Sequence, residues 1–292
     1  MDYLHATAYQ GTALGQSVYG KSANVQSLSR ADLIDFASSN FTAPRIALAA
    51  AGGVDHSALV KSAEANLGGL SGSVDAPAVL PCRFTGSAIQ DRNDDFPFCH
   101  LAIAVEGCGW AHDDYLPLLL AKSIIGSWSK GNAGAANVFG LLGARAFEAM
   151  EAYNAFNVTY TETSLWGAHI VVDKMKTEDA VSCLTREFVR LCSDIVDSDV
   201  ARAKLALLTN LLLAQEDTSG LCANIGQHML AHGKHISALD VCQAIDGLTT
   251  KDVKDVCMKY VYDKCPAVAS VGPTESVPDY NLIRGQMYWM RF

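Results

Sequence analysis

Three segments of the chain have the hydrophobic pattern of β-strands. Residues 98–106 are mostly apolar, residues 156–164 alternate between β-branched and polar side chains, and residues 166–173 form a further apolar run. Successive side chains of a strand point to opposite faces of a sheet, so alternation and β-branching favour strands. We therefore predict three strands here, two of them consecutive.

Apolar residues at helical spacing occupy most of the remaining sequence. One such face covers residues 113–128, another covers residues 138–150, and a helical pattern runs from residue 177 nearly to residue 262. Breaks are expected in the long stretch at Asp197 and at residues 217–220, where helix-capping side chains occur. Strands followed by a run of helices predict an α+β fold, in which helices pack on one face of a mixed sheet.

One combination of elements occurs twice. A helix pattern at residues 252–256 precedes an apolar strand pattern at residues 266–271, which ends at a glycine. Residues 32–36 and 44–51 repeat this order, and again a glycine follows the strand pattern. The offset of about 220 residues is too long for a solenoid and indicates a duplicated domain.

The repeat predicts how the chain is divided. The second copy has about 170 residues before its helix and strand, whereas the first copy has only about 30. We therefore expect residues 1–70 to be the C-terminal part of a first domain and residues 82–292 to be a complete second domain. Residues 71–81, rich in Gly, Ser, Ala and Pro, are the expected linker. Residues 2–7 have no capping side chain, so the chain is expected to begin inside a helix.

Composition and charge narrow the class of protein. Half of the residues are hydrophobic and 18% are charged, as in a globular protein with a substantial core. A net charge of −9 and a pI near 5.3 argue against nucleic acid or anionic lipid as the main partner. Nine dispersed cysteines without a C-x-x-C pair predict reduced thiols in the cytosol or the mitochondrial matrix. No apolar run approaches the roughly 20 residues of a membrane span, and no targeting pattern is evident at the start.

Three histidines, His228, His232 and His235, are candidates for a metal site. The first two are four residues apart, a spacing that presents two imidazoles to one ion from one helix face. The pair lacks the glutamate of H-E-x-x-H, and no third ligand is evident. Gly233 is placed as the residue that ends the helix, so a structural role near the helix C-terminus is favoured over metal binding.

Other motifs do not assemble into an active site. The glycine-rich residues 131–136 lack both common phosphate-binding consensus forms. The acid pairs Asp94-Asp95 and Asp113-Asp114 fall at expected turns or helix starts, where carboxylates cap helices and are solvated. No G-x-S-x-G motif occurs, and no cysteine has a convincing histidine partner. Residue types alone therefore assign no catalytic, metal-binding or cofactor-binding residue.

Two regions of the sequence resemble a known family. The first comprises residues 2–15 (DYLHATAYQGTALG), 27–30, 43–46 and 49–54, and the second comprises residues 156–163 (FNVTYTET), 165–169 (LWGAH), 190–192, 264–269 (KCPAVA), 278–281 and 287–292 (MYWMRF). Together they resemble the family that contains the mitochondrial processing peptidase β subunit and core protein 1 of the cytochrome bc1 complex. The resemblance implies two homologous α+β, peptidase-like halves, of which the second is not catalytic.

The residues that carry the family's zinc chemistry are expected outside this chain. The inverted H-x-x-E-H motif and a further glutamate belong to the family's first half, in a part that precedes the segment resembling residues 2–15, and no H-x-x-E-H occurs here. Active one-chain relatives also supply an Arg and a Tyr from the second half. These positions align by eye near Ala149 and Phe156, which cannot hydrogen-bond an oxyanion. The resemblance thus implies no cofactor in this chain, and zinc only in a full-length peptidase form.

The resemblance leaves two main functions open. One is a scaffold subunit of respiratory complex III, ubiquinol–cytochrome c reductase, on the matrix side of the mitochondrial inner membrane, with a homologous second core protein and other complex subunits as partners. The other is the β subunit of the processing peptidase, a zinc endopeptidase that pairs with an α-type subunit and cleaves basic presequences. The endings at residues 166–169 and 288–292 favour the core protein. A third possibility is a fragment or splice product without a partner, which would expose apolar surface.

Overall fold

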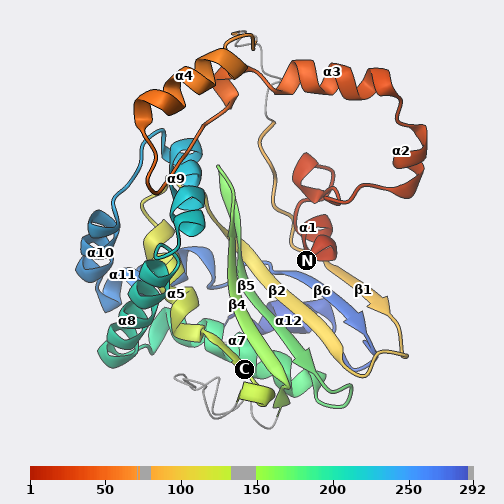
Figure 1. Ribbon diagram of the computed structural model, residues 1–292. Helices are drawn as coiled ribbons and strands as arrows, with labels where there is room; N and C mark the ends of the chain where they lie inside the picture. Colours follow the sequence, from red (N-terminus) through yellow and green to blue (C-terminus); the bar gives the residue numbers. More distant parts are fainter. Residues whose placement is uncertain (71, 73–79, 133–148, 289–292) are drawn as a thin grey trace. The chain divides into compact units, whose positions relative to one another are not determined.

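The computed structural model describes residues 1–70, 72, 80–132 and 149–288 (Figure 1). Two compact units divide the chain. The larger contains Met1–Ser17, Cys82–Thr209 and the residues from Leu239 onward, and the smaller contains Val18–Pro81 and Asn210–Ala238. This division reflects compactness, whereas the expected boundary at residues 71–81 concerns a duplication of the sequence. That boundary stays a prediction.

A six-stranded mixed sheet lies at the centre of the larger unit, in the order β1-β6-β2-β5-β4-β3 (Figure 1). β1 and β6 are parallel, and the other neighbouring strands are antiparallel. The strands are β1 (Ala88–Arg92), β2 (Cys99–Cys108), β3 (Ser127–Ser129), β4 (Ala152–Thr159), β5 (Thr163–Val172) and β6 (Ala267–Gly272). β2, β4 and β5 confirm the three predicted strands, although the predicted strand at residues 156–164 ends at Thr159, where the chain turns into β5.

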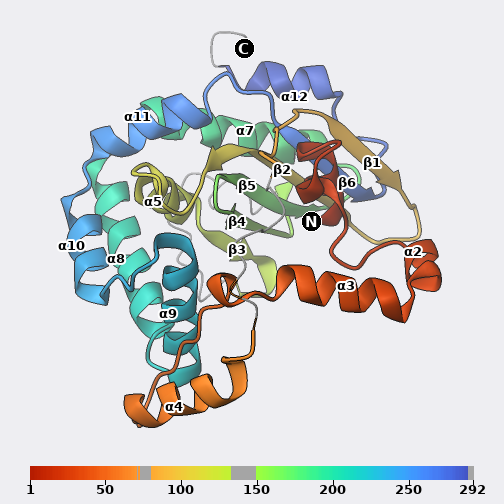
Figure 2. The same cartoon turned by 90° about the horizontal axis from the view of Figure 1, so that it is seen from above.

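Helices cover both faces of this sheet. α5, α7 and α11 pack against one face, α11 also packs on α5 and on α7, α12 packs on α7, and α1 lies against β1, β6 and β2 on the other face (Figure 2). The helices of this unit are α1 (Asp2–Ala8), α5 (Tyr115–Ile125), α7 (Thr177–Ser193), α10 (Ala238–Gly247), α11 (Thr250–Tyr260) and α12 (Tyr280–Gln286), with short 3-10 turns η1 (Ala13–Gly15) and η3 (Lys130–Asn132). The predicted α+β class is confirmed, and the helix expected at residues 2–7 is α1.

The smaller unit is built from helices. It contains α2 (Ser22–Ser27), α3 (Arg30–Asn40), the 3-10 turn η2 (Ala43–Arg45), α4 (His56–Leu67) and α9 (Thr218–His232). α8 (Asp197–Leu213) begins in the larger unit and ends in the smaller. The helix starts of α8 and α9 confirm the two predicted breaks, at Asp197 and at residues 217–220.

On the face of the sheet that α5, α7 and α11 cover, aromatic side chains pack between the sheet and the helices. Trp166 of β5 is fully buried, and its ring centroid lies 5.2 Å from that of Phe188 in α7. The indole N–H donates a hydrogen bond to the Leu118 carbonyl oxygen of α5 at 3.0 Å, so the polar atom of this large side chain is satisfied. Full burial of the Phe188 side chain stabilises the fold by about 1.5–3 kcal/mol.

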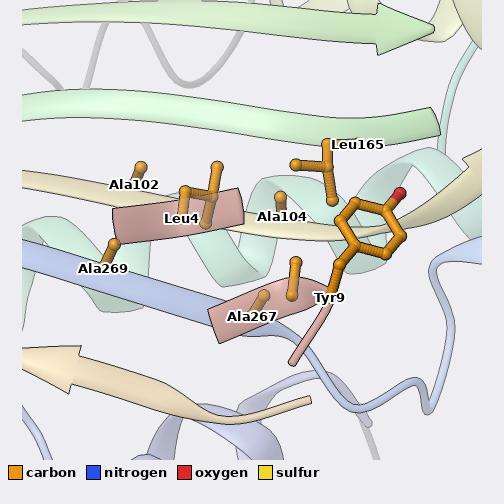
Figure 3. Packing of buried hydrophobic residues seen from close by; sticks show 8 residues of the cluster. Leu4, Tyr9, Ala102, Ala104, Leu165, Ala267 and Ala269 are labelled. Atoms are coloured by element: carbon orange, nitrogen blue, oxygen red, sulfur yellow. The ribbon is translucent and has the colours of Figure 1, made fainter. Parts of the chain in front are cut away.

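The opposite face is shaped by small residues. Four buried alanines lie side by side on the paired strands β2 and β6: Ala102, Ala104, Ala267 and Ala269. Leu4 belongs to α1 and Tyr9 follows it directly, and both side chains pack on these alanines, as Figure 3 shows. Methyl side chains let the helix backbone approach the sheet closely, which larger side chains would prevent.

Two predicted helices differ from the structure. The helix expected at residues 113–128 ends at Ile125, because Gly126 adopts a left-handed backbone conformation (φ 69°) and the chain enters β3. Of the helix expected at residues 138–150, all but the last two residues lie outside the described residues. The same holds for residues 133–136 of the glycine-rich stretch, most of residues 71–81, and residues 289–292 of the closing segment.

The predicted strand at residues 44–51 is wrong. Residues 43–45 form η2, and residues 46–51 are extended chain that pairs with no strand of the described part. A strand needs hydrogen-bonding partners from another segment, and an apolar sequence pattern cannot supply them. The equivalent residues of the second repeat do have neighbours, since β6 lies between β1 and β2.

The two repeats nevertheless share backbone landmarks at a constant offset. Ser29 and Asp32 form a capping box at the start of α3, and Thr249 and Asp252 form the same box at the start of α11. The offset is 249 − 29 = 220 residues. Gly52 and Gly272, also 272 − 52 = 220 residues apart, both have positive φ, at 105° and 114°. Local structure therefore recurs where the sequence pattern does.

Candidate functional site

The three histidines of the metal hypothesis do lie together. The ring centroid of His228 is 5.9 Å from that of His232 and 5.6 Å from that of His235. Burial and the two neighbouring rings lower the pKa of His228, and its Nδ1 accepts a hydrogen bond from the Ile236 backbone N–H at 3.4 Å. Across the described residues, no group of three or more His, Cys, Asp or Glu side chains is placed to hold a metal ion.

The end of α9 follows the sequence-based expectation. Gly233 has φ 68°, and its N–H donates to the Met229 carbonyl oxygen at 3.0 Å. This left-handed glycine confirms that the helix ends at His232 and that His235 lies beyond it. His228 and His232 thus occupy the last turns of a helix, where imidazoles interact favourably with free carbonyl groups.

The acid pairs lie at turns and helix starts, as expected. Asp114 precedes α5 and accepts hydrogen bonds from Lys259 Nζ at 2.6 Å and Tyr260 Oη at 3.0 Å. Burial opposes its charge, but these two hydrogen bonds hold the pKa of Asp114 below its ordinary value. Asp94 pairs with Arg92 at 3.0 Å in the turn after β1. Both arrangements fix the chain locally, as carboxylates at turns and helix starts commonly do.

The positions aligned with the family's second-half Arg and Tyr carry hydrocarbon side chains. Ala149 is buried, and Phe156 packs against the cluster beneath α1 that includes Tyr9. Neither side chain has a polar atom, so neither can donate a hydrogen bond to a developing oxyanion.

A further candidate surface is apolar. The segment of the first repeat exposes large hydrophobic side chains from α3 and from the chain that follows it. We call this set the first-repeat surface; it comprises Leu33, Ile34, Phe36, Phe41, Ile46 and Leu48. Large hydrophobic side chains exposed together on one short segment are typical of a site of contact with other protein.

The corresponding positions of the second repeat are buried, because other helices pack on them. Leu33 of α3 is 59% exposed, whereas Val253, 220 residues later in α11, is fully buried. Phe36 is 61% exposed, whereas its counterpart Val256 is 7% exposed. α11 packs on α5 and α7, while α3 buries none of its residues. The capping-box spacing is a sequence signal that would have matched these positions residue by residue.

Neither a zinc site nor a membrane span is supported by the residues present. H-x-x-E-H does not occur in the sequence, and the described side chains do not group as metal ligands, so the residues present do not fit the family's zinc ion. Within the described part of the chain, no helix has both the length and the apolar character needed to cross a bilayer.

Comparison with known proteins defines the family. The family description "Peptidase M16 inactive domain" matches residues 27–207, which is more than half of the chain. The chain therefore belongs to the M16 peptidase family. A chain of complex III from Candida albicans, solved with the compound Inz-5 bound, has the same fold, with a TM-score of 0.90 at 25% identity over 98% of this chain and 69% of that one.

Curated relatives come from two kinds of mitochondrial protein. Human cytochrome b-c1 complex subunit 1 is 44% identical over all of this chain and 62% of its own length. The bovine mitochondrial-processing peptidase subunit beta is 41% identical over 99% of this chain and 60% of its own length. The resemblance inferred from sequence is confirmed. The chain spans about three fifths of the length of these relatives.

Proposed function

We propose that this chain belongs to a core subunit of mitochondrial complex III, in which it serves as a scaffold. One observation carries the proposal: nearly the whole chain has the fold of a complex III chain, with a TM-score of 0.90. The match of residues 27–207 to an inactive peptidase domain and the 44% identity to human cytochrome b-c1 complex subunit 1 support it. The partners would be a homologous second core protein and other subunits on the matrix side of the inner membrane.

The first-repeat surface supports an additional contact within the protein itself. The first repeat shares the capping box at its helix start and the glycine of positive φ with the second, but the second repeat is completed by a sheet and helices that the first repeat lacks in the described residues. The relatives are longer than this chain. We infer that further sequence of the same protein covers Leu33 and Phe36, as α5 and α7 cover Val253 and Val256.

The alternative is the β subunit of the processing peptidase, and a similar identity of 41% favours it. In that form a zinc site in the remainder of the protein would supply the chemistry, and this chain would be its non-catalytic portion. The two proposals therefore differ in the partner and in the sequence outside this chain, since the fold is common to both.

Purification of the tagged full-length protein from its own mitochondria separates the alternatives. The scaffold proposal predicts that the haem spectra of cytochromes b and c1 co-elute with the tag in mild detergent, and that a presequence peptide remains uncut. A haem-free complex with an α-type partner that cleaves the peptide would overturn it and establish the peptidase alternative.

A further inference from the structure

A cavity of about 550 Å³ in the larger unit is lined by three separate segments, two of which contribute charged or nucleophilic side chains. It lies where the chain before β1, the end of β2 and the residues at and after the end of α11 meet. The lining side chains that carry a carboxyl, amine, phenol or thiol group are Glu106, Lys259, Tyr260, Lys264 and Cys265. The volume falls within the range of small-molecule sites, about 300–1,000 Å³.

The charges around this cavity have two signs. Lys259 contributes a cation that already pairs with Asp114 at 2.6 Å, whereas the side chain of Lys264 has no carboxylate partner among the described residues. On the β2 side, burial raises the pKa of Glu106, and a hydrogen bond from Thr163 Oγ1 at 3.3 Å opposes that shift. A ligand that carries both carboxylate and ammonium groups would match these charges, with its carboxylates towards the lysines.

Cys265 has a cation placed at its sulfur. Arg284 Nε donates a hydrogen bond to Cys265 Sγ at 3.2 Å, and the guanidinium is held by Asp263 through Nη2 at 2.8 Å. The remaining terminal nitrogen, Nη1, is buried without an acceptor, so the guanidinium has a further donor available. Arg284 thus places a fixed positive charge within hydrogen-bonding distance of the sulfur, where it stabilises the negative charge that the sulfur carries during attack on a disulfide.

Gly86 keeps the sulfur in this position. A Cβ at residue 86 would lie 2.5 Å from Cys265 Cβ and 2.8 Å from Tyr280 Oη, which is closer than side chains can approach. The absence of a side chain at residue 86 therefore permits Cys265 to lie at the cavity, beside Arg284.

Several other cysteines have the opposite environment. Burial raises the pKa of Cys99 and Cys108 to about 11 and that of Cys192 to about 12, so these three remain thiols at neutral pH. Cys265 is exposed. It is therefore the cysteine whose surroundings favour reaction with a reagent from solvent.

We propose that this cavity binds a small, net-anionic peptide disulfide of the glutathione type and that Cys265 is the residue it modifies. The Cys265 thiolate attacks one sulfur of the bound disulfide, a new Sγ–S bond forms, and the original S–S bond breaks. The departing sulfur leaves with the electron pair and takes a proton from solvent. Cys265 is thereby oxidised to a mixed disulfide and the departing thiol is reduced, with the peptide disulfide as the oxidant.

The test uses the purified full-length protein and two reagents, glutathione disulfide and the uncharged 2-hydroxyethyl disulfide. Peptide mass mapping over time gives a modification rate for each cysteine. With glutathione disulfide, Cys265 should react before the half-buried Cys82 and Cys242. Lys264→Gln should slow this reaction about threefold, the size expected for one exposed charge pair, and should leave the reaction with the uncharged reagent unchanged.

Lys174→Gln, which removes a lysine that does not line the cavity, is the matched control and should change neither rate. Arg284→Gln should slow both reagents, because it acts on the sulfur and not on the ligand's charge. The proposal is overturned if Cys265 reacts no faster than Cys82, or if Lys264→Gln affects both reagents equally or neither.

Discussion

At the scale of single residues, a largely buried ion network on α7 holds two helices together. Arg190 contacts Glu187 at 2.6 Å within α7 and Asp199 of α8 at 2.9 Å. Although burial opposes its charge, the hydrogen bonds to Glu187 and Asp199 raise the pKa of Arg190 above its ordinary value. Sequence spacing indicates the i,i+3 pair on one helix, but it cannot reveal the contact with α8, which depends on how the helices pack.

Replacing Arg190 with Met should lower the free energy of unfolding by about 3–5 kcal/mol, because the buried Glu187 carboxylate would lose its cation, whereas Asp199 keeps its ion pair with Arg202 at 3.0 Å. The exposed Arg92, which pairs with Asp94 and Glu275, is the control, and Arg92→Met should lower the free energy of unfolding far less, because solvent screens an exposed ion pair. Denaturant unfolding measures both changes. Equal losses for the two variants would contradict the importance of burial here.

His169 gives a pH dependence with a definite sign. Burial, together with the neighbouring His100 ring at a centroid distance of 5.5 Å, lowers the pKa of His169 below its ordinary value. The unfolded chain therefore takes up this proton at higher pH than the folded chain. The contribution of neutral His169 to stability is complete above about pH 6.5 and is lost as the pH falls through the lower, folded-state pKa.

His169→Gln should consequently flatten the loss of thermal stability between pH 7 and pH 5, whereas His56→Gln on exposed α4 should leave the slope as it is. Melting temperatures over a pH series measure the slope. An unchanged slope in His169→Gln would show that other groups dominate acid destabilisation.

At the scale of elements, sequence patterns predicted most of the structure because their signals are local. Alternation predicted β4, apolar runs predicted β2 and β5, and the glycine after α9 predicted the helix end. The predicted strand at residues 44–51 is wrong, because a strand forms only when another segment, often distant in sequence, hydrogen-bonds to it. β1 was not predicted for the same reason: Ala88–Arg92 has little apolar character and forms a strand by pairing with β6.

The two capping boxes allow the repeats to be compared in one experiment. Thr249→Ala should lower the unfolding free energy by about 1 kcal/mol, because α11 is packed into the larger unit and loses its cap. Ser29→Ala removes the matching cap from α3, which buries no residue, so global unfolding of the isolated chain should not change. Equal costs would mean that α3 is integrated into a folded core.

At the scale of the whole molecule, we propose that residues 82–292 form one α+β domain and that residues 1–70 are the last elements of another. The family and the fold were predictable because they follow from sequence patterns spread over the whole chain. The charged groups of the cavity at Cys265 could not be predicted, as they come from segments that only the folded larger unit brings together.

The first-repeat surface should make the isolated chain self-associate. Phe36→Glu combined with Leu33→Glu places charges on that surface and should reduce the apparent mass in light scattering, whereas Leu239→Glu, at an exposed site on α10, should have little effect. A clean monomer for the unmodified chain would contradict this expectation.

Hydrogen exchange of the backbone amides at residues 47–51 tests the central claim most directly. In the isolated chain these amides donate no backbone hydrogen bond within the described residues, so they should exchange rapidly, while the amides of β6 are protected. In the full-length protein both segments should be protected, because residues 46–51 would then pair as β6 does. Equally rapid exchange at residues 47–51 in both proteins would contradict the account.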